Sequence, residues 1–148
     1  MKDDIKELTE AIIAGSYALD CLKKARDEVS SAGSWGIVDL LGGGIISGMV
    51  KHSKMNNASE SLEEAKDALR SYQDELDDLD DIQNLDISID SFLTFADFMF
   101  DNVFTDWMVQ EKITEAKSKL DEAIRRIEKL QVQLKEEKRL LQEQAGQL

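Results

Sequence analysis

The sequence predicts an all-α fold, an elongated antiparallel helical bundle or coiled coil of three long helices and one shorter phenylalanine-rich helix. Its 148 residues contain no proline, and 33% of them are charged. In three long stretches the apolar residues recur every three or four positions, which is the spacing of a buried helix face. At this length we expect a single domain over residues 1–148.

The first helix is predicted over residues 3–31, with Gly33 as its left-handed C-cap. Two positions on its apolar face are unusual for a packed helix. Arg26 must pair with a carboxylate or extend toward solvent. Gly15 lies in a run of small residues, AIIAGSYA, where another helix or a bulky ring can approach closely.

A glycine-rich stretch follows, and it holds six of the eight glycines, one of the two tryptophans and the only histidine. We expect a hinge over residues 33–44, because glycine adopts either sign of φ without steric cost. Ser34 can cap a short helical turn within it, and Gly42 would end that turn. Helix is expected to resume over residues 45–83.

The two remaining long helices differ in charge. Residues 55–84 carry two positive and ten negative side chains, whereas residues 109–143 carry nine positive and eight negative ones. A helix predicted over residues 107–143 is therefore the relatively basic partner for the acidic one, and we expect the two to pair antiparallel.

Between them lies a segment with all five phenylalanines, for which we expect a connector and a phenylalanine-rich helix over residues 85–106. Its apolar face would comprise Phe92, Phe95, Met99 and Val103. Because exposed clusters of phenylalanine are rare on proteins in water, this helix should fold back along the bundle. The small side chains expected to receive it are Ala11, Ala14, Gly15 and Ala18.

Charge and cysteine content restrict the function class. The net charge of −13 argues against nucleic-acid binding, which needs lysine and arginine to displace counterions from phosphates. Cys21 has no second cysteine to pair with, and its neighbours indicate a small buried side chain. The first residues, MKDDIKELTE, are acidic and unlike a signal peptide, so we expect a cytoplasmic protein.

No sequence motif indicates a cofactor or an enzyme. Gly43 and Gly48 have the spacing of a phosphate-binding loop, but Met49 stands where such a loop requires lysine. His52 could act as a general base oriented by Asp39. No second histidine or nucleophile supports that role, so we expect a partly exposed helix residue and a non-enzymatic protein.

A metal site is the weaker alternative for the acidic phenylalanine-rich segment. Asp97 and Asp101 are four residues apart on one helical face, a spacing that suits a hard cation. The Glu-x-x-His pairs of di-iron bundles do not occur in the sequence. We therefore expect a solvated acidic face and no metal.

The stretch Trp35–Val50 also raises a membrane alternative, since its sixteen residues are apolar except for Asp39 and Ser47. A spanning helix needs about 20 residues without a central acid. As an apolar tongue between amphipathic helices, the stretch resembles the inserting hairpins of α-helical pore-forming toxins. The simpler interpretation is that these residues close the end of the bundle core or pack against another copy of the chain.

The most distinctive residues resemble a pattern found in uncharacterised bacterial helical proteins, W-G-x-x-D-x-x-G-G-G, then K-H-S-K, then F-x-D-W. The matching residues are Trp35, Gly36, Asp39, Gly42, Gly43, Gly44, Lys51, His52, Ser53, Lys54, Phe104, Asp106 and Trp107. The resemblance implies a helical fold and no particular activity.

These observations predict a non-enzymatic coiled-coil interaction or scaffold module that binds protein and self-associates. The alternatives are a membrane-recruited helical protein using residues 35–50, and a small-molecule or metal-binding bundle. The expected interaction surface comprises Trp35, Asp39, Gly42, Gly43, Gly44, Lys51 and His52.

Overall fold

The computed structural model describes residues 2–42, 45–79, 85–104 and 113–146, excluding the side chains of residues 2, 31–57, 86, 113 and 114. Its elements are α1 (Lys2–Gly42), α2 (Ile45–Asp77), α3 (Asp86–Phe98), the π-helical η2 (Met99–Phe104) and α5 (Ile113–Gly146). Apart from a turn at residues 78–79, these described residues are helical, and they include no strand. The predicted all-α class is therefore confirmed.

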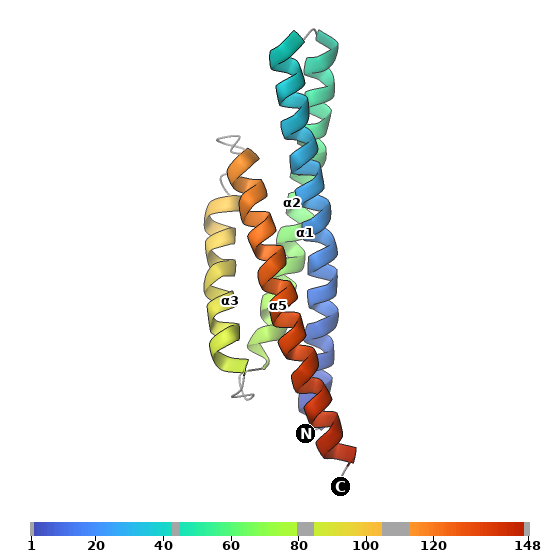
Figure 1. The fold of residues 1–148 in the computed structure, drawn as a ribbon, viewed down its shortest axis with the longest axis vertical. Helices are drawn as coiled ribbons and strands as arrows, with labels where there is room; N and C mark the ends of the chain where they lie inside the picture. The colour runs from blue at the N-terminus through green and yellow to red at the C-terminus, as the bar shows by residue number, and fades with distance from the viewer. Residues whose placement is uncertain (1, 43–44, 80–84, 105–112, 147–148) are drawn as a thin grey trace.

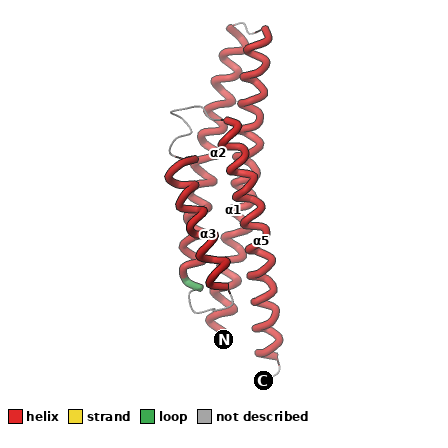
Figure 2. Tube along the Cα trace, turned by 60° about the vertical axis from the view of Figure 1, so that its left-hand side comes forward, coloured by secondary structure: helices red, strands yellow, loops and turns green. Residues whose placement is uncertain are grey.

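The helices alternate in direction along an elongated molecule (Figure 1). α1 and α2 form a long antiparallel hairpin, α5 packs along α1, and α3 with η2 lies against α2 and α5. Figure 2 shows the same order from a second side. α5 thus runs antiparallel to α1 and parallel to α2. The predicted antiparallel pairing of the acidic and basic helices is wrong, because the phenylalanine-rich segment supplies an additional reversal between them.

α1 is longer than the sequence indicates. It continues to Gly42, through the predicted end near residue 31 and most of the predicted hinge at residues 33–44. One internal glycine costs a helix only about 1 kcal/mol. A helix of this length is stabilised mainly by the neighbour along which it packs, and α2 accompanies α1 to its end in Figure 1. Tertiary pairing therefore outweighs the local stop signal.

The other boundaries differ less from the predicted ones. α2 begins at Ile45 as predicted and ends at Asp77, with residues 80–84 outside the description. The phenylalanine-rich helix begins at residue 86 and passes into the π-helical turns of η2. α5 is described from Ile113 and extends to Gly146, three residues beyond its predicted end. Trp107 and Asp106 lie outside the described residues.

The core is built from the apolar positions with three-four spacing. Among the described side chains of α1, α2 and α5, the large ones that are fully buried are Leu8, Leu22, Val29, Leu69, Tyr72, Leu76, Leu120, Ile127 and Leu134. Alanines fill the closer contacts between helices, for example Ala25, Ala65 and Ala123, each of which is also fully buried. Cys21 is buried among them, as predicted.

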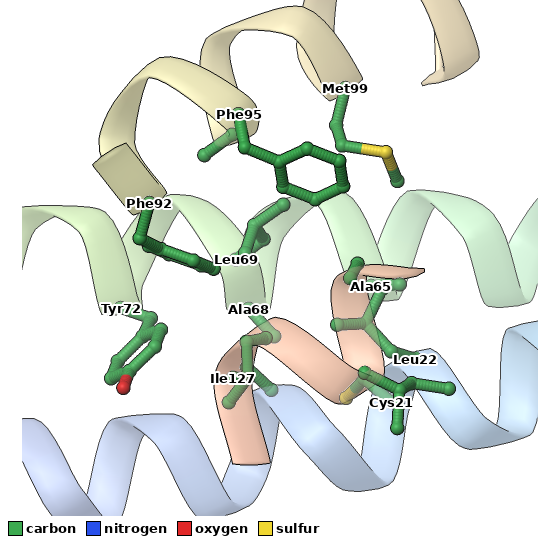
Figure 3. Packing of buried hydrophobic residues seen from close by; sticks show 14 of the residues in the cluster. Cys21, Leu22, Ala65, Ala68, Leu69, Tyr72, Phe92, Phe95, Met99 and Ile127 are labelled. Atoms are coloured by element: carbon green, nitrogen blue, oxygen red, sulfur yellow. The ribbon is translucent and has the colours of Figure 1, made fainter. Parts of the chain in front are cut away.

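The predicted apolar face of the phenylalanine-rich segment is confirmed, but its neighbours differ from those expected. Figure 3 shows Phe92, Phe95 and Met99 pointing from α3 and η2 toward α2. The Phe92 ring meets the Tyr72 ring edge-on, with centroids 5.5 Å apart. Gly15, expected to receive a ring, instead lies against the side chain of Gln131 on α5. The phenylalanines therefore pack on α2 and α5, and the small residues of α1 accommodate α5.

Three cations also hold the phenylalanine-rich segment, which has no positive charge of its own. Each lies over one phenylalanine ring: Arg70 over Phe100 at 4.7 Å, Lys119 over Phe98 at 5.1 Å and Arg126 over Phe95 at 4.5 Å. The cations come from α2 and α5, on either side of the segment. Cation–π attraction therefore adds to apolar burial in holding α3 and η2 in place.

Candidate functional site

The predicted interaction surface lies at one end of the α1–α2 hairpin. We call residues 31–42 and 45–57 the hairpin end. Trp35, Asp39 and Gly42 belong to the last turns of α1, and Lys51 and His52 belong to the first turns of α2. Gly43 and Gly44 lie outside the described residues. Figure 1 shows the hairpin end continuing past the first turn of α5 and past η2. We call the part of the molecule in which α3, η2 and α5 pack on α1 and α2 the body.

The register of the hairpin places Trp35 and His52 at the same level. In the body, Lys24 of α1 and Glu64 of α2 form an ion pair at 3.4 Å. From this pair Trp35 is eleven residues further along α1 and His52 is twelve residues back along α2. The two residues therefore lie about 10 Å from the helix ends at Gly42 and Ile45, since a helix rises 1.5 Å per residue.

The hairpin end differs from the body in composition. From residue 31 to 57 it carries one aspartate and two lysines, so its formal net charge is +1, whereas the rest of the chain carries 16 positive and 30 negative side chains. It also holds eight residues of type Ile, Leu, Val and Met between Gly36 and Lys51. The part of the hairpin that α3 and α5 do not accompany therefore combines eight large aliphatic residues with a single acidic one.

The two aspartates considered as a cation site, Asp97 and Asp101, lie on the surface of the phenylalanine-rich segment. Asp97 and Asp101 are both exposed on α3 and η2. Asp97 accepts a hydrogen bond from Gln73 Nε2 of α2 at 3.0 Å. Among the described side chains, no cluster of three or more histidine, cysteine, aspartate or glutamate residues has a geometry that could hold a metal ion.

One cavity separates the start of α3 from α5, with a volume of about 230 Å³. Its lining residues are Ile87, Ser88, Ser91, Phe92, Arg126, Lys129, Leu130 and Gln133. The Arg126 side chain is exposed and already has two partners, the Glu122 carboxylate at 3.2 Å and the Phe95 ring. Small-molecule pockets usually enclose about 300–1,000 Å³, so this cavity lies below the ordinary range.

A buried polar contact in the body escaped sequence reasoning. Gln131 is only 4% exposed, and its Nε2 donates a hydrogen bond to the Ile12 carbonyl oxygen of α1 at 2.9 Å. Its Oε1 accepts a hydrogen bond from the Tyr72 hydroxyl of α2 at 3.0 Å. In the sequence, Gln131 stands four residues after Ile127 and three before Leu134, which is the spacing of the buried face of α5. This spacing could have indicated a buried glutamine. This contact joins three helices and has no reactive group, so it has a structural role.

No protein-family model matches the chain, and no curated protein or solved structure matches it either. The resemblance to bacterial helical proteins through Trp35, Asp39 and the KHSK segment stays a prediction. Within the described part of the chain, no helix combines the length and the apolar character needed to cross a bilayer.

Proposed function

We propose that the protein is a non-enzymatic interaction module that self-associates through the hairpin end. One observation carries the proposal: at its apolar segment, the α1–α2 hairpin extends beyond α3, η2 and α5, which cover the rest of it. An amphipathic helix is stabilised by burying its apolar face against another element. Two paired helices bury only the faces that they turn toward each other. In the body, α5 and α3 with η2 pack on α1 and α2 and complete the core.

A second copy of the same hairpin end would supply that missing pair. Two hairpins packed side by side make a four-helix arrangement like that of the body. Charge favours this mode over contact between bodies, because the bodies carry the whole excess of negative charge and repel each other. The hairpin ends, at net +1 each, meet with little repulsion.

A shortened hairpin tests the proposal. Deleting residues 36–42 and 45–51 together removes about two turns from each helix, so the remaining helices keep their relative phase. The deletion leaves Trp35 and His52 on either side of the glycine pair. We expect the intact chain to sediment as a concentration-dependent dimer and the shortened chain to sediment as a monomer.

The body supplies the control for this experiment. Val132, exposed on α5, is replaced in Val132→Ser, and this variant should associate like the intact chain. Circular dichroism checks that the shortened chain keeps its helical body. An intact chain that stays monomeric at every concentration would refute self-association. A shortened chain that still dimerises would place the interface elsewhere.

The charge of the hairpin end also supports a second candidate, recruitment to an anionic membrane surface. Lys51 and Lys54 follow the apolar segment, and basic residues beside apolar ones favour interfacial binding. Flotation with vesicles of neutral lipid and of mixed neutral and anionic lipid distinguishes the two candidates. Membrane recruitment predicts co-flotation with anionic vesicles, lost in the shortened chain. Self-association alone predicts no flotation with either lipid.

A further inference from the structure

A second surface lies on the body, on the side of α1 that faces away from α5. Ile13 and Tyr17 are exposed there over 64% and 61% of their surface. They are four residues apart on α1, so they lie next to each other on one helical face. Tyrosine is enriched at the centre of protein–protein interfaces, and the buried centre of an interface is more apolar than the rest of the surface.

The adjacent face of α2 is almost entirely acidic. Nine residues between Ala58 and Leu79 are exposed, and seven of these are carboxylates. They are Glu60, Glu63, Glu64, Asp67, Asp74, Asp77 and Asp78. Among the other two, Arg70 lies over the Phe100 ring and is therefore directed toward η2. Glu63 and Asp77 lie seven residues before and after Arg70, so they share its side of the helix. The other five carboxylates form a stripe of negative charge on the outer surface between Glu60 and Asp78.

The apolar pair and the acidic stripe adjoin, because the face of α1 that carries Tyr17 also carries Lys24, which contacts Glu64 of α2 at 3.4 Å. A hydrogen bond with Cys21 is the largest cause that raises the pKa of Tyr17, and the carboxylates of Glu64 and Asp67 raise it further. Lys24, two turns after Tyr17, pairs with Glu64. Lys6, about two turns before Ile13, pairs with Glu10 at 4.0 Å. The nearby cations of α1 are therefore matched by carboxylates, and the stripe retains an excess of negative charge.

We propose that this surface, with Ile13 and Tyr17 at its centre and the α2 carboxylates along its edge, binds a basic amphipathic helix of another protein. Two antiparallel helices present a groove whose side chains recur every three or four residues, and a third helix docks through the same spacing. Lysine or arginine beside the apolar stripe of the partner would meet the α2 carboxylates. A second copy is the wrong occupant, because pairing this face with itself opposes two acidic stripes.

The test uses the full chain and two synthetic helical peptides of about 18 residues, or five turns. One carries leucine on one face and lysine on the other, and its counterpart carries glutamate in place of lysine. We expect the lysine peptide to bind, and the glutamate peptide to bind at least about tenfold more weakly. The double variant Ile13→Ser, Tyr17→Ser should weaken binding of the lysine peptide by about tenfold or more, the usual effect of truncating a central interface residue.

Val132→Ser is the matched control, because Val132 is 68% exposed on α5, where the charges have mixed sign. It should leave the Kd unchanged. If the double variant binds the lysine peptide as tightly as the intact chain, the attraction is unspecific and the proposal fails. If the double variant abolishes self-association instead, the occupant is a second copy and the proposal again fails. The chain with a shortened hairpin end should bind the peptide normally, so this result is independent of the proposed self-association.

Discussion

Gly15 of α1 and Gln131 of α5 are so close that a methyl group on the glycine would lie 2.3 Å from the glutamine Oε1 atom. The same glutamine accepts a hydrogen bond from Tyr72 and donates one to the Ile12 carbonyl. The glycine thus makes room for a buried amide that links α1, α2 and α5. A buried polar contact of this kind favours one register of the helices over others, since any slip leaves the amide without partners.

Gly15→Ala should destabilise the protein. Alanine improves helix propensity by about 1 kcal/mol, but forcing an extra carbon into a filled core costs about 1–3 kcal/mol. Urea unfolding followed by circular dichroism measures the difference. In a Gln131→Ala background the space is vacant, so the same substitution should become stabilising. Gly146→Ala, where nothing lies within 4 Å, is the control and should not destabilise. Equal effects of Gly15→Ala in both backgrounds would contradict the contact.

Tyr72 should make the protein sensitive to alkali. Burial raises the pKa of its hydroxyl above the ordinary value of 10.0. The unfolded chain therefore loses this proton at lower pH than the folded chain. The stabilising contribution is complete below about pH 10, and it falls by about 1.4 kcal/mol for each pH unit above this value until the folded group also ionises. Urea midpoints between pH 9 and 11 should decline in the intact chain.

Tyr72→Phe supplies the comparison for the alkaline transition. It should remove the Tyr72 part of the decline, and it should cost about 1–2 kcal/mol at neutral pH because Gln131 loses a donor. Tyr17→Phe changes an exposed tyrosine and should retain the Tyr72 decline. A Tyr72→Phe variant with the full alkaline decline would show that another group is responsible.

Glu75 of α2 is predicted to weaken the fold at neutral pH. Burial raises its pKa above the ordinary 4.5, and Glu10 of α1 with Asp78 and Asp74 raises it further. The charged form is therefore disfavoured in the folded chain. Glu75→Gln should increase the urea midpoint at pH 7, and this gain should vanish as the pH falls below about 4, where the wild-type group is protonated in both states. Glu63→Gln, on an exposed part of the same helix, should give a smaller change, and a larger one would contradict the assignment.

Arg126 is expected to hold α3 to α5 through Phe95. Replacing it in Arg126→Gln should cost about 1 kcal/mol, the scale of one cation–π contact, and should speed hydrogen exchange in α3 more than in α1. Arg125→Gln, the neighbouring exposed arginine, serves as the control. Equal exchange in α3 for both variants would show that the arginine contributes little beyond charge.

The fold class and much of the core could be predicted from the sequence, because apolar residues that recur every three or four positions mark the buried face of a helix. Leu8, Leu22 and Leu69 stand at apolar positions with the three-four spacing, and all three are buried. The face from Phe92 to Val103 was found in the same way. Arg26 was expected to pair or to reach solvent, and it pairs with Asp121 of α5 at 3.5 Å.

The remaining features depend on which helices become neighbours, and spacing does not encode this. Gly33 has the local chemistry of a helix end, yet α1 continues because α2 runs beside it. Gly15 indicated a close approach, but only the arrangement of α1 and α5 identifies Gln131 as the group that fills the space. For the candidate site, the register of α1 and α2 brings Trp35 level with His52. The composition of the glycine-rich stretch grouped Trp35 with His52, but it did not indicate where the two residues lie relative to each other.

The two ends of the described chain, Lys2 and Gly146, lie at the end of the molecule opposite the hairpin end (Figure 1). α1 alone has 41 residues and is therefore about 60 Å long. Any label, tag or surface attached near Lys2 or Gly146 is held at roughly that distance from Gly42. Immobilising the protein near either residue therefore leaves the hairpin end directed away from the support.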